Sequence, residues 1–428
     1  MSTAPEAETD IYTRRESVVR AYCRSFPASF VQAQGATLTD EQGREYTDFL
    51  AGCASLNYGH NDPDMKAALV EHLSRDALTH GLDLHTPEKA AFLETFEALV
   101  LRPRGMDHRV MMTGPTGTNA IEAALKLARK VTGRTNVVSF TNGFHGMTLG
   151  ALSLTANLSK RAGAGVALTD VTRLPYDGAF GEGIDTLTQI EAMLENPSSG
   201  MEPVAAFVVE LVQGEGGLNA ASAEWVRGLA RLARAHGALL IIDDIQAGIG
   251  RAGSFFSFDG MGIEPDMVTM AKSLSGYGLP FACVLVRPEH DIWEPAEHNG
   301  TFRGNGHAFV TARVALEKFW SDDSLTREVA AKSRLLETRL GAMAARIDGA
   351  RVKGRGMMRG IDVGSGSRAA AICETCFRSG LIIETSGAHD EVVKVLAPLT
   401  IPDAQFRAGL DILEEAVDNI VSLPMAAE

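Results

Sequence analysis

The middle of the chain alternates short, almost wholly apolar runs with longer amphipathic segments. The apolar runs lie at residues 137–140, 205–210, 238–243, 266–271 and 281–286. Strands buried on both faces have this pattern, whereas strands with one face in water alternate apolar and polar residues. Between these runs, segments 116–133 and 223–237 carry apolar residues at helical spacing and end at a glycine. The pattern predicts an α/β fold whose sheet is mostly parallel and covered by helices.

The pattern changes after about residue 308. Long amphipathic segments at 311–320 and 324–347 are followed by short strand-like runs near 351–363 and 392–396. A chain of 428 residues is long enough for one large and one small domain. We therefore expect three parts: an N-terminal segment that packs with the small domain (1–58), a large domain (59–307) and a smaller α+β domain (308–428).

Composition narrows the possible partners. The net charge of −14 argues against nucleic acid, because phosphate backbones are bound by basic surfaces. The five cysteines are taken as isolated thiols without the spacing of a zinc site, which indicates a reducing compartment and no metal. There is no run of 18 apolar residues, and the first ten residues lack the basic and apolar parts of a signal peptide. We expect a cytoplasmic protein that does not enter membranes.

Polar side chains follow several of the predicted strands. Glu210, Asp243 and Lys272 stand at or directly after the ends of three apolar runs. In open α/β sheets, ligands bind in the crevice outside the carboxyl ends of the strands. The three side chains are therefore expected to meet in one crevice.

Lys272 and Asp243 are the candidates for chemistry. Lysine is rarely buried, and desolvation lowers its pKa and leaves a nucleophilic amine. The alternative for Lys272 is a lysine on a surface loop. A buried carboxylate such as Asp243 needs a cationic or donor partner, which a protonated pyridinium nitrogen or a helix N-terminus would supply. The first partner would make pyridoxal phosphate an electron sink.

Two further pairs of residues suit a flat, phosphorylated ligand. Gly117 and Thr118 lie where the helix over 116–133 begins, and free N–H groups there bind phosphate, although an ordinary capped helix is equally consistent. Phe144 and His145 follow the run 137–140, so the aromatic ring could stack on a ligand or belong to the core. Without a complete Walker motif, a nucleoside triphosphate is not expected.

Seven motifs occur in order along nearly the whole chain: DFLAGCASLNYGHNDP, TGTNAIEAALKLAR, FHG, VELVQGEGG, DDIQAGIGRAG, AKSLSGYGLP and HNGTFRGN. Together they resemble the class III (omega) aminotransferases of fold-type I. Within that class, YCRSFP, THGLDLHT, FRGN and the stretch 111–152 are most similar to members that serve ectoine biosynthesis. Those members interconvert L-aspartate 4-semialdehyde plus L-glutamate and L-2,4-diaminobutyrate plus 2-oxoglutarate.

The resemblance implies pyridoxal 5'-phosphate as the cofactor and a role for each matching residue around its ring. Lys272 would form the Schiff base and carry protons between substrate and cofactor carbons. Asp243 would hold the ring nitrogen, Gln246 would reach the ring hydroxyl, and Phe144 would stack on the ring beside His145.

The resemblance also implies how the phosphate is held. Gly117 and Thr118 would bind it, and Thr301 of a neighbouring subunit would complete its shell. A homodimer would then be the smallest active unit, and a larger homo-oligomer is equally consistent. Glu210 matches a position near the cofactor without a defined role.

The substrate pocket departs from the family pattern at two positions. Met147 stands where many relatives have an arginine for a substrate carboxylate, so we expect Arg303 to supply that contact. Lys394 also stands in place of an arginine, and lysine lacks the bidentate fork. In the family, the residue at Glu215 pairs with that cation and swings away to admit a dicarboxylate. Cys53 matches a substrate-pocket position, although a small buried thiol is an equally good interpretation.

Three other functions remain open at this point. Another omega-aminotransferase would act on ornithine, 4-aminobutyrate or an N-acetylated diamine. An aminomutase or decarboxylase on the same fold would not need 2-oxoglutarate. A cofactor-binding protein without activity would lack the nucleophile, and Lys272 in its motif argues against it.

Overall fold

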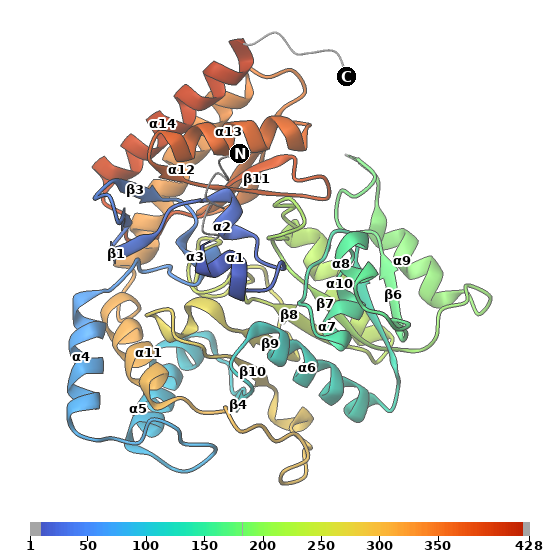
Figure 1. The fold of residues 1–428 in the computed structure, drawn as a ribbon. Coiled ribbons are helices and arrows are strands. Elements are labelled where there is room, and N and C mark those ends of the chain that lie inside the picture. Colours follow the sequence, from blue (N-terminus) through green and yellow to red (C-terminus); the bar gives the residue numbers. More distant parts are fainter. Residues whose placement is uncertain (1–9, 182, 423–428) are drawn as a thin grey trace, which may run out of the picture.

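The computed structural model describes residues 10–181 and 183–422. A seven-stranded sheet lies at its centre, with the strand order β4-β10-β9-β8-β7-β5-β6 (Figure 1). Its strands are β4 (Arg109–Met112), β5 (Asn136–Phe140), β6 (Val171–Leu174), β7 (Val204–Val209), β8 (Leu239–Asp243), β9 (Met267–Met270) and β10 (Cys283–Val286). Only β10 runs antiparallel to its two neighbours, β4 and β9. The prediction of a mostly parallel sheet is confirmed, and each predicted apolar run contains a strand.

Helices cover both faces of this sheet. On one face, α6 (Gly117–Thr132) packs against alternate strand residues such as Val208 and Ile241. On the other face, α10 (Ala223–Ala235) packs against the residues between them, such as Phe207 and Leu240. Because both faces are covered, every residue of β5, β7, β8, β9 and β10 is buried. This explains the apolar runs of the sequence.

Two smaller sheets join the beginning and the end of the chain. One contains β1 (Phe30–Gln34), β2 (Thr37–Asp40), β3 (Glu45–Asp48) and β13 (Leu381–Ile382), which pairs parallel to β3. The other contains β11 (Arg351–Arg355), β12 (Met358–Asp362), β15 (Val392–Val395) and β14 (Glu384–Ser386). Figure 1 shows the blue strands beside the red and orange C-terminal helices α12 (Ser324–Ala344), α13 (Gly366–Arg378) and α14 (Asp403–Ser422). The preceding helix α11 (Gly306–Phe319) packs instead against α4 (Pro63–Ser74) and α5 (Pro87–Phe96).

Shorter elements connect these parts. They are α1 (Ile11–Arg15), α2 (Tyr22–Ser25), α3 (Ala51–Ala54), α4 (Pro63–Ser74), α5 (Pro87–Phe96), α7 (Leu149–Leu154), α8 (Leu158–Ala162), α9 (Thr186–Glu195), η1 (Glu97–Leu101), η2 (Arg102–Arg104), η3 (Lys272–Ser275) and η4 (Pro288–His290). Among the described residues, no helix has both the length and the apolar character needed to cross a membrane.

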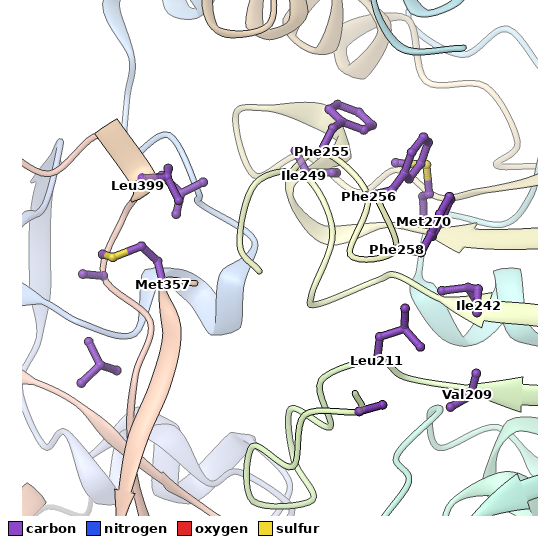
Figure 2. Close-up of a cluster of buried hydrophobic side chains, with 14 of the residues drawn as sticks. Val209, Leu211, Ile242, Ile249, Phe255, Phe256, Phe258, Met270, Met357 and Leu399 are labelled. Carbon is purple, nitrogen blue, oxygen red and sulfur yellow. The ribbon is translucent and has the colours of Figure 1, made fainter. Parts of the chain in front are cut away.

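The core extends from the carboxyl ends of the central strands toward the C-terminal part. Figure 2 shows Ile242 and Met270 of the sheet near Phe256, and Met357 on the C-terminal side. Arg251 is fully buried in the loop that follows β8, where burial lowers the pKa of its guanidinium to about 9. Its N–H groups donate to the Asn57 side chain and to backbone carbonyl oxygens of the C-terminal part. One side chain thus connects three distant segments.

One expectation about the cysteines is wrong. Cys373 and Cys376 have the spacing of a Cys-x-x-Cys pair and lie on α13, so the five cysteines are not all isolated. Both are free thiols. Burial raises the pKa of Cys376 to about 12 and that of Cys373 well above its usual value. Thiols with so little thiolate are poor nucleophiles, so the pair does not have the properties of a redox motif.

Candidate active site

A cavity of about 170 Å³ opens at the carboxyl edge of the seven-stranded sheet. It is lined by Gly117, Thr118, Phe144, His145, Gly146, Glu210, Glu215, Asp243, Ile245, Gln246 and Lys272. These residues come from the ends of β5, β7, β8 and β9 and from the beginning of α6. The crevice expected from the strand ends is therefore present, and it contains every cofactor residue expected from the sequence except Thr301.

Asp243 is the last residue of β8 and is almost fully buried. Its Oδ2 lies 2.7 Å from Nδ1 of His145, and its Oδ1 accepts hydrogen bonds from Ile245 N–H and Thr269 Oγ1. Burial alone would lower the pKa of His145, but the hydrogen bond and charge of Asp243 outweigh it and raise that pKa. No helix begins after Asp243, since the next element is β9, so the helix-cap alternative is excluded.

Lys272 follows β9 at the first position of η3. Its backbone φ is 51°, in the left-handed region that residues other than glycine rarely adopt. Desolvation by burial lowers the pKa of its amine, although nearby Glu215 acts in the opposite direction. The surface-loop alternative does not fit, because Lys272 lines the cavity beside Asp243.

Gln246 has an acceptor that the protein does not satisfy. Its Oε1 is buried and has no hydrogen-bond partner among the described residues, whereas its Nε2 donates to the Cys53 carbonyl oxygen at 3.3 Å. A Cβ on Gly214 would come within 1.6 Å of this Oε1, so only glycine leaves room for the amide. Buried polar atoms are almost always paired, and a ligand hydroxyl would satisfy this one.

The amino end of α6 forms another part of the cavity wall. Gly117 and Thr118 begin this helix of 16 residues, and Thr116 and Asn119 form a capping box there. A Cβ on Gly117 would lie 2.9 Å from Cδ1 of Ile245, so the close packing requires glycine. The helix N-terminus suits a phosphate. With the unpaired Gln246 acceptor and the buried Asp243, the cavity fits pyridoxal phosphate.

Glu210 holds two backbone segments of the cavity wall in place. Its carboxylate accepts hydrogen bonds from the backbone N–H groups of Phe144 (2.8 Å) and Gly214 (3.2 Å). Burial raises the pKa of Glu210 to about 7. Glu210 therefore fixes the backbone of Phe144 and of the turn that carries Glu215. Phe144 is half-buried and lines the cavity, so it does not belong wholly to the core.

Lys394 lies beneath Glu215 and has no exposed side-chain surface. Its Nζ is 3.0 Å from Oε1 of Glu215 and 2.9 Å from Oε1 of Glu384. Burial would lower the pKa of Lys394, but the two carboxylates outweigh it and raise that pKa. Burial alone would raise the pKa of Glu215, but the charge of Lys394 outweighs burial and lowers the pKa of Glu215. Glu384 could not be predicted from the sequence, because its position opposite Lys394 arises from strand pairing.

A turn with unusual backbone conformation adjoins the substrate side. All four residues of α3 have positive φ, including Cys53 at 56°. The Sγ atom of Cys53 lies 2.8 Å from the hydroxyl of Tyr22, and burial raises the pKa of this thiol to about 11. Cys53 is therefore a neutral thiol next to the site. Sequence reasoning missed Tyr22, whose only signal is its place in the YCRSFP motif.

Two expected residues lie elsewhere in the subunit. Thr301 is exposed and is not among the residues that line the cavity. Arg303 lines a different cavity together with Trp293 and donates hydrogen bonds to the His298 carbonyl and the Asn299 side chain. Neither can act on the cavity of its own subunit in this arrangement. Their roles remain predictions that require a second subunit.

A lysine that lines the cavity, a buried aspartate and a helix N-terminus at the carboxyl edge of this mixed sheet define a pyridoxal-phosphate-dependent enzyme of fold-type I. The family model described as aminotransferase class-III matches residues 20–417. The chain belongs to this family, so it is an aminotransferase, and the prediction from the motifs is confirmed.

Known proteins agree with this placement. The chain is 54% identical to diaminobutyrate–2-oxoglutarate transaminase of Halomonas elongata over 97% of this chain and 100% of that protein. It is 52% identical to the enzyme of the same name from Nocardia farcinica, over 97% and 95% of the two chains. Among solved structures, ornithine aminotransferase from Toxoplasma gondii has a TM-score of 0.82 at 27% identity, over 96% and 94% of the chains.

Proposed function

We propose that this aminotransferase moves an amino group between L-glutamate and the terminal carbon of L-aspartate 4-semialdehyde. The products are 2-oxoglutarate and L-2,4-diaminobutyrate, as the names of the similar transaminases suggest. The observation that carries the proposal is the Glu215–Lys394 pair beside the cavity. With the pair closed, the site accepts an amine carbon without a carboxylate; with Glu215 displaced, Lys394 receives the carboxylate of glutamate.

Lys272 and Asp243 carry the chemistry in this proposal. When bound, the cofactor supplies a pyridinium ring that stabilises negative charge on the substrate carbon next to nitrogen. Asp243 would hold the proton of the ring nitrogen, and the hydrogen bond from His145 keeps the carboxylate in place. The lowered pKa of the Lys272 amine suits a base that takes a proton from the substrate carbon and would carry it to a carbon of the cofactor.

The remaining cofactor contacts follow from the walls of the cavity. Gly117 and Thr118 hold the phosphate at the beginning of α6. The free acceptor of Gln246 would receive the ring hydroxyl, and Phe144, which lines the same cavity, would stack on the ring. Glu210 acts indirectly, since it fixes the backbone of Phe144.

We also propose a homodimer in which Thr301 and Arg303 serve the partner's cavity. Leu82 and Phe302 are exposed by 42% and 67%, and the segments that carry them lie side by side through a hydrogen bond from Gly81 to Gly304. Large exposed apolar patches mark interfaces. Arg303 would then contact the glutamate side-chain carboxylate that Met147 cannot bind, and Cys53 would contact the substrate from its own subunit.

We also propose the domain boundaries and the cellular location expected from the sequence. The division at residues 58 and 307 is supported by the two smaller sheets, whose strands all come before residue 58 or after residue 307 in the chain. A cytoplasmic location is supported by the free state of all five cysteines.

The test of function is the absorbance spectrum of the purified holoenzyme before and after each amine. L-glutamate and L-2,4-diaminobutyrate should each remove the visible band of the bound cofactor, and Lys272→Ala should remove both responses. A response to glutamate together with ornithine or 4-aminobutyrate, but not diaminobutyrate, would assign another omega-aminotransferase. A holoenzyme that responds to no amine would refute the proposal.

The shared site has its own test. Mixing Thr301→Ala subunits with Lys272→Ala subunits should restore activity, because one cavity of the mixed dimer then combines an intact Lys272 with an intact Thr301. Mixtures that stay as inactive as the parents would show that Thr301 does not act across subunits.

A further inference from the structure

Lys394 has a second carboxylate partner that does not belong to the turn carrying Glu215. Strands β14 and β15 are antiparallel, and Glu384 stands directly opposite Lys394 in their register. The Oε1 atom of Glu384 lies 2.9 Å from the Lys394 ammonium, and the Glu384 side chain is only 12% exposed. Cross-strand neighbours of opposite charge stabilise each other, so this contact is part of the sheet.

The two carboxylates differ in how freely they can leave Lys394. Glu215 lies in the turn after β7, outside any strand or helix, whereas Glu384 belongs to β14. A lysine ammonium has three protons and can serve two acceptors at once, unlike the fixed fork of an arginine. Lys394 can therefore exchange Glu215 for a substrate carboxylate while Glu384 keeps it in position.

This arrangement sets the charge next to the substrate. One ammonium faces two carboxylates, so the cluster is more negative than a simple ion pair. A dicarboxylate brings more negative charge to this place, whereas a diamino acid brings a second ammonium group. Other ionisable groups of the described residues that interact with Glu384 include Tyr22, Cys53, Lys272 and Cys373.

We propose that Glu384 determines specificity: its fixed carboxylate on Lys394 weakens the binding of dicarboxylates and favours substrates with a second ammonium group. The part about diamino acids rests on the function proposed above, and the part about dicarboxylates does not. Glu384 thus adjusts a site in which Lys394 would otherwise favour glutamate and 2-oxoglutarate.

The test uses the holoenzyme and the variant Glu384→Gln, which keeps a hydrogen-bond acceptor and removes the charge. Calorimetry measures the Kd of glutarate, a dicarboxylate that cannot exchange an amine. Glutarate should bind at least about threefold more tightly to the variant, because removing one charge at contact distance changes the potential at Lys394. The half-saturating concentration of L-2,4-diaminobutyrate in its half-reaction should rise by at least about threefold for the same reason.

The control is Glu191→Gln on α9, which changes the net charge equally at an exposed position and should shift neither ligand. Glu384→Ala is a second neutral variant and should move the two ligands in the same opposite directions. Lost packing would weaken both ligands, so weaker or unchanged glutarate binding overturns the role of Glu384. A wild-type enzyme that ignores diaminobutyrate refutes the proposed function, and the glutarate result still decides the role of Glu384.

Discussion

Replacing Lys394 by methionine tests the buried charge cluster most directly. The change keeps much of the side-chain volume and removes the cation that lies 3.0 Å from Glu215 and 2.9 Å from Glu384. With an effective permittivity near 20, an ion pair at this distance is worth roughly 5 kcal/mol before desolvation is counted. The variant would leave the partly buried carboxylates of Glu215 and Glu384 without their shared cation, which is unfavourable.

Proton uptake limits the cost. Holding a carboxyl group of ordinary pKa protonated at pH 7 costs about 3–4 kcal/mol, so one carboxyl of the variant should become neutral instead of bearing the full repulsion. Burial already raises the pKa of Glu384, which makes it the group that takes the proton. We therefore expect Lys394→Met to lower the free energy of unfolding by about 3 kcal/mol at pH 7.

The sign of the pH dependence follows from linkage. A carboxyl with a raised pKa binds more protons in the folded than in the unfolded state, so its contribution to stability falls as pH rises. In the wild type, Lys394 lowers the pKa of Glu215, which adds stability above the unfolded pKa and loses it on acidification. The Glu215 contribution is fully present above about pH 4.5 and is lost only below that pH, so it is constant between pH 5 and pH 8. The deficit of the variant should therefore grow from pH 5 to pH 8 only through the raised pKa of its neutral carboxyl.

The assay is the thermal unfolding midpoint of wild-type and variant holoenzyme at one scan rate, measured from pH 5 to pH 8. A deficit of about 3 kcal/mol corresponds to roughly 3 °C for a chain of this length. Lys66→Met, at an exposed position of α4, is the matched control and should show no pH-dependent deficit. A deficit that is constant with pH, or largest at pH 5, would refute the reasoning.

Three further substitutions test other parts of the structure. Asp243→Asn should keep the cofactor bound but slow the glutamate half-reaction about 100-fold or more, because an amide cannot hold the proton of the ring nitrogen. Stopped-flow absorbance measures the rate, and a wild-type rate would contradict the role of Asp243. Gly214→Ala would place a Cβ within 1.6 Å of Gln246 Oε1 and displace this acceptor of the cofactor hydroxyl. Cofactor affinity, measured by equilibrium dialysis, should fall about tenfold, and an unchanged affinity would exclude the contact between Gln246 and the hydroxyl. Arg251→Met should lower the unfolding free energy, measured by urea titration, by about 3 kcal/mol or more, because the buried Ala397 carbonyl and Asn57 side chain lose their donor. A loss below about 1 kcal/mol would contradict the connecting role of Arg251.

Local patterns in the sequence were sufficient for the large sheet and for most of the cavity. A strand buried on both faces must be apolar throughout, so β5, β7, β8 and β9 could be located without tertiary information. The carboxyl ends of parallel strands meet at one edge, which brought Glu210, Asp243 and Lys272 together in the prediction as they lie in the structure. The beginning of α6 was visible for the same kind of reason, since a capped amphipathic helix has a local signature.

Only the tertiary structure decided the contacts that depend on register or on distant segments. The antiparallel direction of β10 leaves no mark in a strand that is apolar throughout. Glu384 lies opposite Lys394 because of the β14–β15 register, and Tyr22 reaches Cys53 because the N-terminal segment crosses the site. Burial and helical periodicity are recorded residue by residue in the sequence, whereas register and long-range pairing result from packing the whole chain, so no local pattern contains them.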